Sequence, residues 1–294
     1  MYLKMTCFGL AALLAALATA PAVADETVNV GGARAVLIRP KTVRASVILL
    51  PGGSGVIQAG DQGDIHGLLG NQLVRTRNAY AARGLAVLVA DAGTNLKSAV
   101  DYMAAIKRPV TVIATSRGTI RAAEGIAGGA RPDALVLTSG FLSPESGGGG
   151  NVMSIVGSPS ALPRTLVIHH RQDSCRFTQP AGVDPFIKWS AGRARVSWLS
   201  GGAEEGDPCE ARGHHGFNGL DGQVVGLAGG FAEGRWSEVR EDRHSGARVS
   251  ANPESRDYNL EIPRCAIAHL RFSPRGLPRN DGGTMRELMR HPLT

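Results

Sequence analysis

The sequence predicts a doubly wound α/β fold, in which helices cover both faces of a mostly parallel sheet. Three observations support this prediction. Short β-branched runs alternate with helical patterns over residues 28–232. Several of these runs are apolar throughout, as in strands that are buried on both faces. Hydrophobic residues make up 43% of the 294 residues, which is enough for a sizeable core.

Seven segments are predicted to be strands because they are short, apolar and rich in β-branched residues. They cover residues 34–38, 45–50, 85–91, 110–114, 134–138, 165–169 and 195–199. Helices are predicted over residues 71–83, 96–107, 119–127 and 220–232. Gly84, Pro109 and Gly128 follow three of these helices, as residues that end helices commonly do. Residues 141–163 include four consecutive glycines, so we expect a flexible loop with room for one short helix.

The first 24 residues are expected to be a signal peptide. Lys4 gives a basic start, residues 8–20 are apolar, and Ala22-Val23-Ala24 fits the small-x-small pattern that signal peptidase reads. The apolar run is shorter than the roughly 20 residues of a spanning helix, and an uncleaved anchor is the alternative. No later stretch is predicted to cross a membrane. The mature chain is therefore expected to begin at Asp25 and to be periplasmic or secreted.

Residues 235–294 differ in composition from the rest of the chain. They are rich in Arg, Ser, Pro and Asn, and their single apolar stretch covers residues 262–272. Such a segment buries too little surface to offset its ordering entropy, so a disordered extension is expected. A binding tail is the alternative. Residues 25–234 then form the folded domain.

The net charge of +7 does not indicate nucleic-acid binding. The basic residues are scattered, and many lie in the C-terminal extension. No stripe of Lys and Arg with interleaved aromatic residues is present in the sequence.

The strongest functional motif surrounds Ser116, in the sequence Ala114-Thr-Ser-Arg-Gly118. It follows a predicted strand and opens a predicted helix, which is the setting of the G-x-S-x-G nucleophile elbow. Ala114 replaces the first glycine. Small residues at 114 and 118 permit a sharp turn that exposes the serine hydroxyl, and the helix N-terminus favours a developing negative charge. An ordinary strand-to-helix turn with a capping serine is the alternative.

Two further residues have the types that a serine nucleophile needs. The hydroxyl requires a base, and the base is oriented by a carboxylate. Asp173 follows the predicted strand 165–169, and His215 lies in the loop after the predicted strand 195–199. Both loops leave the carboxyl ends of strands, where α/β folds place their sites. The chain order Ser, Asp, His fits an α/β-hydrolase triad.

With these motifs, the sequence resembles the α/β-hydrolase superfamily, in particular its esterases and dienelactone-hydrolase-like members. The matching segments are Leu50-Pro-Gly-Gly-Ser-Gly55, Thr115-Ser-Arg-Gly-Thr119, Asp173 and His215-Gly-Phe217. The resemblance covers about residues 28–232. It implies that the base directly precedes Gly-Phe, which favours His215, with His214 as the alternative. Ala114 and the C-terminal extension depart from the family pattern.

The oxyanion hole is expected to use the amide of Gly53 or Ser54 together with that of Arg117. The glycines around residue 53 let the backbone approach a substrate closely. A phosphate-binding loop is not favoured, because the Gly-Lys-Ser/Thr ending is missing. His169 and His170 are expected to pack around the acid loop, since their spacing fits no zinc motif.

Cysteine positions predict one disulfide. Cys7 leaves with the signal peptide, and three cysteines remain in an oxidising compartment. Cys175 lies two residues after Asp173 and Cys209 six residues before His215, so the two thiols meet if the acid and the base meet. We expect a Cys175–Cys209 bond and a leftover Cys265.

The sequence thus predicts a serine hydrolase that cleaves a small-molecule carboxylic ester without a cofactor or metal. Two alternatives remain. The first is a non-catalytic binding protein on the same fold. The second is a peptidase or thioesterase with the same triad, because leaving-group preference depends on pocket shape. No oligomeric state is predicted.

Overall fold

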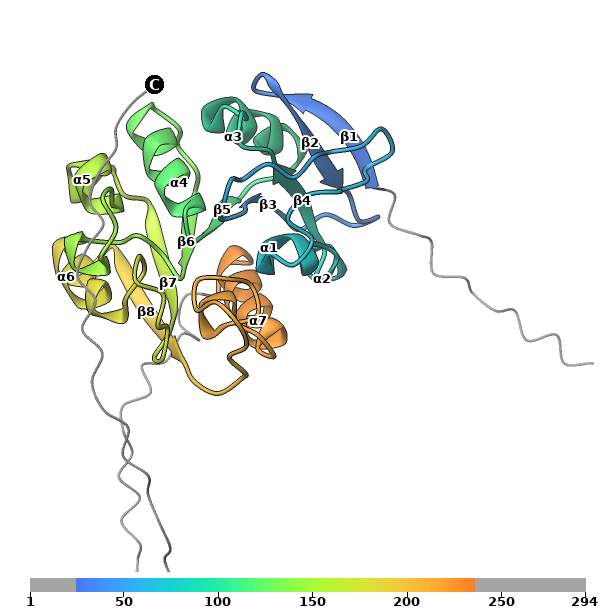
Figure 1. Cartoon of the computed structure of the whole chain (residues 1–294). Coiled ribbons are helices and arrows are strands. Elements are labelled where there is room, and N and C mark those ends of the chain that lie inside the picture. The colour runs from blue at the N-terminus through green and yellow to red at the C-terminus, as the bar shows by residue number, and fades with distance from the viewer. Residues whose placement is uncertain (1–24, 236–294) are drawn as a thin grey trace, which may run out of the picture. The chain divides into compact units, whose positions relative to one another are not determined.

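The structure is a computed structural model in which residues 25–235 are described (Figure 1). The expected signal peptide lies outside the described residues. So do Cys7, Cys265 and all of the expected C-terminal extension except Arg235. The expectations for these segments stay predictions.

The described residues form one sheet of eight strands. The strands are β1 (Asp25–Val30), β2 (Ala33–Ile38), β3 (Ala45–Leu50), β4 (Leu85–Ala90), β5 (Val110–Thr115), β6 (Ala134–Thr138), β7 (Arg164–His170) and β8 (Ala194–Leu199). Their order across the sheet is β1-β2-β4-β3-β5-β6-β7-β8. The β1–β2 and β2–β4 pairings are antiparallel, and the other five pairings are parallel. The predicted mostly parallel sheet is confirmed.

Helices cover both faces of this sheet. They are α1 (Gln72–Arg75), α2 (Arg77–Ala82), α3 (Leu96–Ile106), α4 (Gly118–Ala127), α5 (Val152–Val156), α6 (Val183–Trp189) and α7 (Asp221–Ala232). Alternate strand residues face opposite sides, so Ile48 belongs to one buried apolar cluster and Val47 and Leu49 to the other. Helices α3 to α6 supply residues to the first cluster, and α1, α2 and α7 to the second (Figure 1). The predicted doubly wound architecture is confirmed.

All seven predicted strands are present, with ends that differ from the prediction by at most one residue. Their continuous apolar sequences reflect complete burial, because every residue of β3, β4, β5 and β6 is buried. Strand β1 was not predicted. It lies at the edge of the sheet, and only Val30 of its six residues is buried, so its sequence lacks an apolar run.

The helices agree less closely with the prediction. The single helix predicted over residues 71–83 is two helices, α1 and α2, which meet at Thr76. The Thr76 hydroxyl donates a hydrogen bond to the Gln72 carbonyl (2.6 Å) at this break. Helix α5 is the short helix for which the loop 141–163 had room. Helix α6 was not predicted, because its sequence contains Pro185, which a helix tolerates only in its first turn.

Candidate active site

A cavity of about 370 Å³ lies beside the carboxyl ends of β5 and β7. Ser116 and His215 both line it, and so do Gly53 and Arg117. With Phe141 and Cys175, which also line it, the cavity is formed by loops that follow five strands: β3, β5, β6, β7 and β8. This is the edge of the sheet at which parallel α/β folds place their sites.

Ser116 occupies a sharp turn between β5 and α4. Its φ of +52° lies in the left-handed region, which residues other than glycine seldom adopt. The turn is fixed on both sides. The Ser116 amide donates to the Thr138 carbonyl (2.9 Å), and the Ser116 carbonyl accepts from the amide and hydroxyl of Thr119 (2.9 and 2.7 Å). The predicted strand–turn–helix setting of the motif is present.

Two glycines are required by the close approach of other chain segments to this turn. A Cβ atom on Gly118 would lie 2.1 Å from the Leu50 carbonyl oxygen, so α4 could not begin so close to β3. A Cβ atom on Gly52 would lie 2.8 Å from Cβ of Ser116. Ala114, in contrast, is fully buried within β5, where a methyl group is accommodated.

The imidazole of His215 is paired with the carboxylate of Asp173. His215 Nδ1 lies 3.1 Å from Asp173 Oδ2, and the Asp173 side chain is completely buried. The other carboxylate oxygen, Oδ1, accepts a hydrogen bond from the Cys175 amide (3.0 Å). Hydrogen bonds to both oxygens fix the orientation of the carboxylate. The imidazole is thereby held with Nδ1 toward the acid.

His214, the alternative base, has different partners. Its ring stacks on that of His170 with centroids 4.3 Å apart, and its Nδ1 lies 3.1 Å from an oxygen of Glu204. His214 is also absent from the cavity wall. Of the two neighbouring histidines, His215 is the one that faces Asp173.

Ser116 and His215 line the same cavity, but no hydrogen bond joins them within residues 25–235. Such contacts are often long in the absence of substrate and shorten when it binds. Of the expected oxyanion-hole residues, Gly53 and Arg117 line the cavity. Ser54 does not, and its exposed hydroxyl accepts a hydrogen bond from the Val56 amide (3.2 Å).

Comparisons with known proteins extend these observations. No protein-family model matches the sequence, and no curated protein matches it. Several solved structures are similar to it. A Thermus thermophilus protein superposes with a TM-score of 0.53 at 17% identity, over 75% of this chain and 100% of its own. An esterase from Pyrococcus furiosus superposes with a TM-score of 0.52 at 12% identity, over 71% of this chain and 90% of its own.

The chain has the α/β-hydrolase fold. The resemblance inferred from the motifs is thus confirmed at the level of the fold. In this α/β-hydrolase fold, Ser116 follows β5, Asp173 follows β7 and His215 follows β8.

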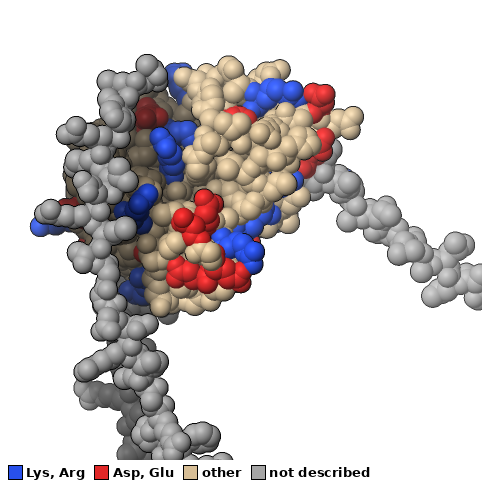
Figure 2. All heavy atoms as spheres, in the orientation of Figure 1, with Lys and Arg blue, Asp and Glu red and all other residues tan. Residues whose placement is uncertain are grey.

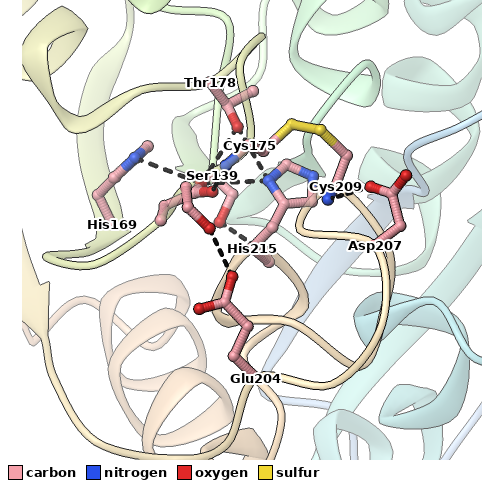
Figure 3. The surroundings of a disulfide bond; sticks show 10 residues. Ser139, His169, Cys175, Thr178, Glu204, Asp207, Cys209 and His215 are labelled. Atoms are coloured by element: carbon pink, nitrogen blue, oxygen red, sulfur yellow. Dashed lines mark hydrogen bonds and ion pairs between the residues drawn. A yellow bond between two sulfur atoms is a disulfide. The ribbon is translucent and has the colours of Figure 1, made fainter. Parts of the chain in front are cut away.

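The predicted disulfide between Cys175 and Cys209 is present, with 4.5 Å between the two Cα atoms (Figure 3). Both cysteines line the cavity, and Cys175 is buried. The bond ties the loop that carries Asp173 to the loop that carries His215. It therefore restrains the two residues whose side chains pair at the site.

His169 and His170 pack beside the acid loop, as expected. Burial lowers the pKa of His169 to about 4, against the opposing effect of the nearby Asp173 carboxylate. Its ring makes an edge contact with Trp198. Burial also lowers the pKa of His170, whose Nδ1 accepts from the Gln172 amide (3.1 Å).

Three residues that hold His215 and Asp173 were not predicted. The Ser139 hydroxyl donates to the His215 carbonyl (2.8 Å), and Arg75 donates to the Gly216 carbonyl (2.8 Å). The Thr178 hydroxyl contacts both His215 and Asp173. Thr178 follows Asp173 by only five residues, which is the one signal that the sequence offered for any of the three.

Within residues 25–235, no group of three or more His, Cys, Asp or Glu side chains is placed to hold a metal ion. Nor is any helix in that range long and apolar enough to span a bilayer. On the face drawn in Figure 2, acidic side chains gather in one area with basic side chains beside them.

Proposed function

We propose that this protein is a serine hydrolase that cleaves a carboxylic ester, with Ser116 as nucleophile, His215 as base and Asp173 as acid. The observation that carries the proposal is one cavity that holds both a serine on a strained strand-to-helix turn and an imidazole oriented by a buried carboxylate. A serine hydroxyl is a poor nucleophile unless a positioned base takes its proton. This arrangement supplies the base and its orientation.

The reaction follows from the orientation of the imidazole. With Nδ1 bonded to Asp173, Nε2 of His215 can accept the Ser116 proton as Oγ attacks the ester carbonyl. Backbone amides of Gly53 and Arg117, which both line the cavity, hold the oxyanion. His215 then protonates the leaving alcohol, and a water molecule activated by the same imidazole releases the acid and restores Ser116. No cofactor takes part.

The substrate is proposed to be an uncharged ester with apolar groups. Among the described residues, the exposed large hydrophobic side chains are Val56, Leu69 and Phe177. Phe177 lines the cavity with Phe141 and stacks on it with ring centroids 6.4 Å apart, and Leu68 lines it beside Gly53. Leu68, Phe141 and Phe177 come from loops after β3, β6 and β7, which lie on both sides of β5, the strand that precedes Ser116. Both halves of an ester would therefore meet apolar surface.

Export from the cytoplasm is part of the proposal. The Cys175–Cys209 bond supports it, because structural disulfides persist mainly in oxidising compartments. Fractionation of cells that produce the full-length chain tests this point. Recovery of the protein only in the cytoplasm, with the initiating methionine intact, would contradict export.

The test of the reaction is a comparison of wild type with Ser116→Ala on p-nitrophenyl esters, together with labelling by a fluorophosphonate. Wild type should hydrolyse the ester and be labelled. Ser116→Ala should not be labelled and should lose on the order of 10⁴-fold in kcat. Wild-type turnover by Ser116→Ala would refute the assignment. A wild-type protein that neither turns over nor reacts would instead support a binding protein on this fold.

A thioesterase or a peptidase with the same three residues is the second reading of the site. Matched oxygen esters, thioesters and anilides of one acyl group separate these activities, because only the leaving group differs. We expect the oxygen ester to give the largest kcat/KM.

A further inference from the structure

Thr178 lies beside the contact between Asp173 and His215 and touches both residues. Its hydroxyl oxygen is 2.9 Å from His215 Nδ1 and 3.1 Å from Asp173 Oδ2, and these two atoms are 3.1 Å apart. The three atoms therefore form a nearly equilateral triangle. Figure 3 shows Thr178 next to the imidazole of His215. Thr178 is fully buried, so no bulk water competes for these hydrogen bonds.

The direction of each hydrogen bond follows from the chemistry of the groups. An ionised carboxylate can only accept hydrogen bonds. The Thr178 hydroxyl therefore donates its one hydrogen bond to Asp173 Oδ2. The hydroxyl oxygen then has lone pairs free and accepts from the N–H at His215 Nδ1. That N–H thus has two acceptors, a hydroxyl and a carboxylate. Only the tautomer protonated at Nδ1 satisfies both.

We propose that Thr178 is a positioning residue for the base of the hydrolase. This inference rests on the proposed function, since it assigns a role within the same reaction. The hydroxyl holds His215 in the tautomer that leaves Nε2 free to accept a proton. It also provides a second acceptor when the imidazole becomes charged in the transition state, which favours that state over the neutral resting imidazole.

The surroundings hold the Thr178 hydroxyl in this place. The Thr178 amide donates to the Cys175 carbonyl (3.1 Å), and Thr178 forms an isolated β-bridge with Gly147. The Cys175–Cys209 disulfide closes the same loop. Because threonine is branched at Cβ, its χ1 angle is restricted, and the hydroxyl has few other directions available.

Thr178 acts on the base without access to the substrate. It is not among the residues that line the cavity, whereas His215 is. Loss of its hydroxyl should therefore change the rate of the chemical step and leave ground-state binding alone. A role confined to folding would predict a different pattern, with lower stability and an unchanged kcat for the folded protein.

The test compares Thr178→Val, Thr178→Ser and wild type in ester hydrolysis. Circular dichroism gives the folded fraction of each protein, and kcat is calculated per folded molecule. Thr178→Val keeps the shape and removes the hydroxyl. It should lower kcat by about 10- to 100-fold with KM within roughly twofold of wild type, the range expected for one lost hydrogen bond to a charged group. Thr178→Ser restores the hydroxyl and should recover kcat to within about fivefold.

Thr165→Val is the matched control. Thr165 is equally buried, and its hydroxyl donates to the Pro163 carbonyl (2.8 Å) at the start of β7, the opposite end of that strand from Asp173. This variant should lose stability but keep the wild-type kcat. If Thr178→Val does not fold, Thr178→Ala removes the same hydroxyl without introducing a misplaced methyl group, and it takes the place of the valine variant.

The outcomes separate this inference from the function on which it rests. A wild-type protein that hydrolyses esters, with a hydroxyl-free variant whose kcat stays within twofold, overturns the role of Thr178 alone. A kcat that Thr178→Ser fails to recover overturns it as well. A wild-type protein without any turnover or fluorophosphonate labelling overturns both proposals.

Discussion

Removal of the disulfide should weaken the fold and the site together, because the bond joins the loops of Asp173 and His215. The perturbation is the double variant Cys175→Ala/Cys209→Ala, in which no unpaired thiol is left at this position. Alanine suits Cys175 because that side chain is buried. Wild type treated with a reductant provides the same perturbation without any substitution.

The size of the effect follows from the length of the loop that the bond closes. The two cysteines are 34 residues apart. In the chain-entropy model, a loop of this length removes about 12.6 cal/mol/K from the unfolded state, or about 3.8 kcal/mol at 25 °C. For a domain of this size, each kcal/mol changes Tm by roughly 2–4 °C. The double variant should therefore melt roughly 8–15 °C lower than wild type.

The assay is equilibrium unfolding in urea, followed by far-UV circular dichroism, with ester hydrolysis measured in parallel. The midpoint should fall and the slope m should rise, because the unfolded chain without the cross-link is less compact and exposes more surface to urea. Reduced wild type should unfold at nearly the same urea concentration as the double variant. The kcat of the folded double variant should also fall, because the acid loop and the base loop are no longer joined.

The reasoning would be refuted if the free energy of unfolding fell by less than about 1 kcal/mol, because loop entropy would then not govern this bond. A large loss of stability with an unchanged kcat would support the loop-entropy calculation. It would refute the claim that the disulfide positions Asp173 and His215. Reduced wild type that behaved unlike the double variant would show that the alanines act through packing.

Two further predictions concern stability and substrate choice. Burial lowers the pKa of His169 to about 4 from the ordinary 6.5, so the unfolded chain binds more protons between these values. About 3 kcal/mol of stability is thus present above pH 6.5 and is lost as the pH falls toward 4. In urea unfolding from pH 7 to 4, His169→Gln should flatten this dependence. The exposed His66→Gln should not, and equal curves for both variants would contradict the explanation. Separately, Phe177→Ala should lower kcat/KM for a hexanoate ester by about 3- to 10-fold, because a cavity-lining apolar surface is lost. An equal loss for the acetate ester would show that Phe177 does not contact the acyl chain.

The fold could be predicted well for segments whose burial requires an apolar sequence. Strands β3, β4, β5 and β6 are predominantly apolar because both of their faces are covered by helices. Strand β1 has no such run, since it lies at the edge of the sheet. The break at Thr76 was also missed, because it depends on a side-chain hydroxyl that bonds to the helix backbone.

The neighbourhood of the site was less accessible to prediction. His214 and His215 are adjacent in the chain, and the short 3₁₀ helix His214–Gly216 decides which imidazole turns toward Asp173. Ser139 and Arg75 are 76 and 141 residues away from their partners in the His215 loop. No local pattern could reveal such contacts, because they exist only after the sheet has brought the strand ends together.

The sequence by itself determined the strand and helix periodicity, the tight turn at Ser116 and the chain order of Ser116, Asp173 and His215. These features depend on neighbouring residues: on burial of a continuous segment and on the small residues that a sharp turn needs. Tertiary structure alone decided that the Thr178 hydroxyl contacts both Asp173 and His215, and that Leu68, Phe141 and Phe177 line one cavity. Hydrogen bonds of this kind act over about 3 Å, and only the packed sheet brings loops from separate strands within that distance.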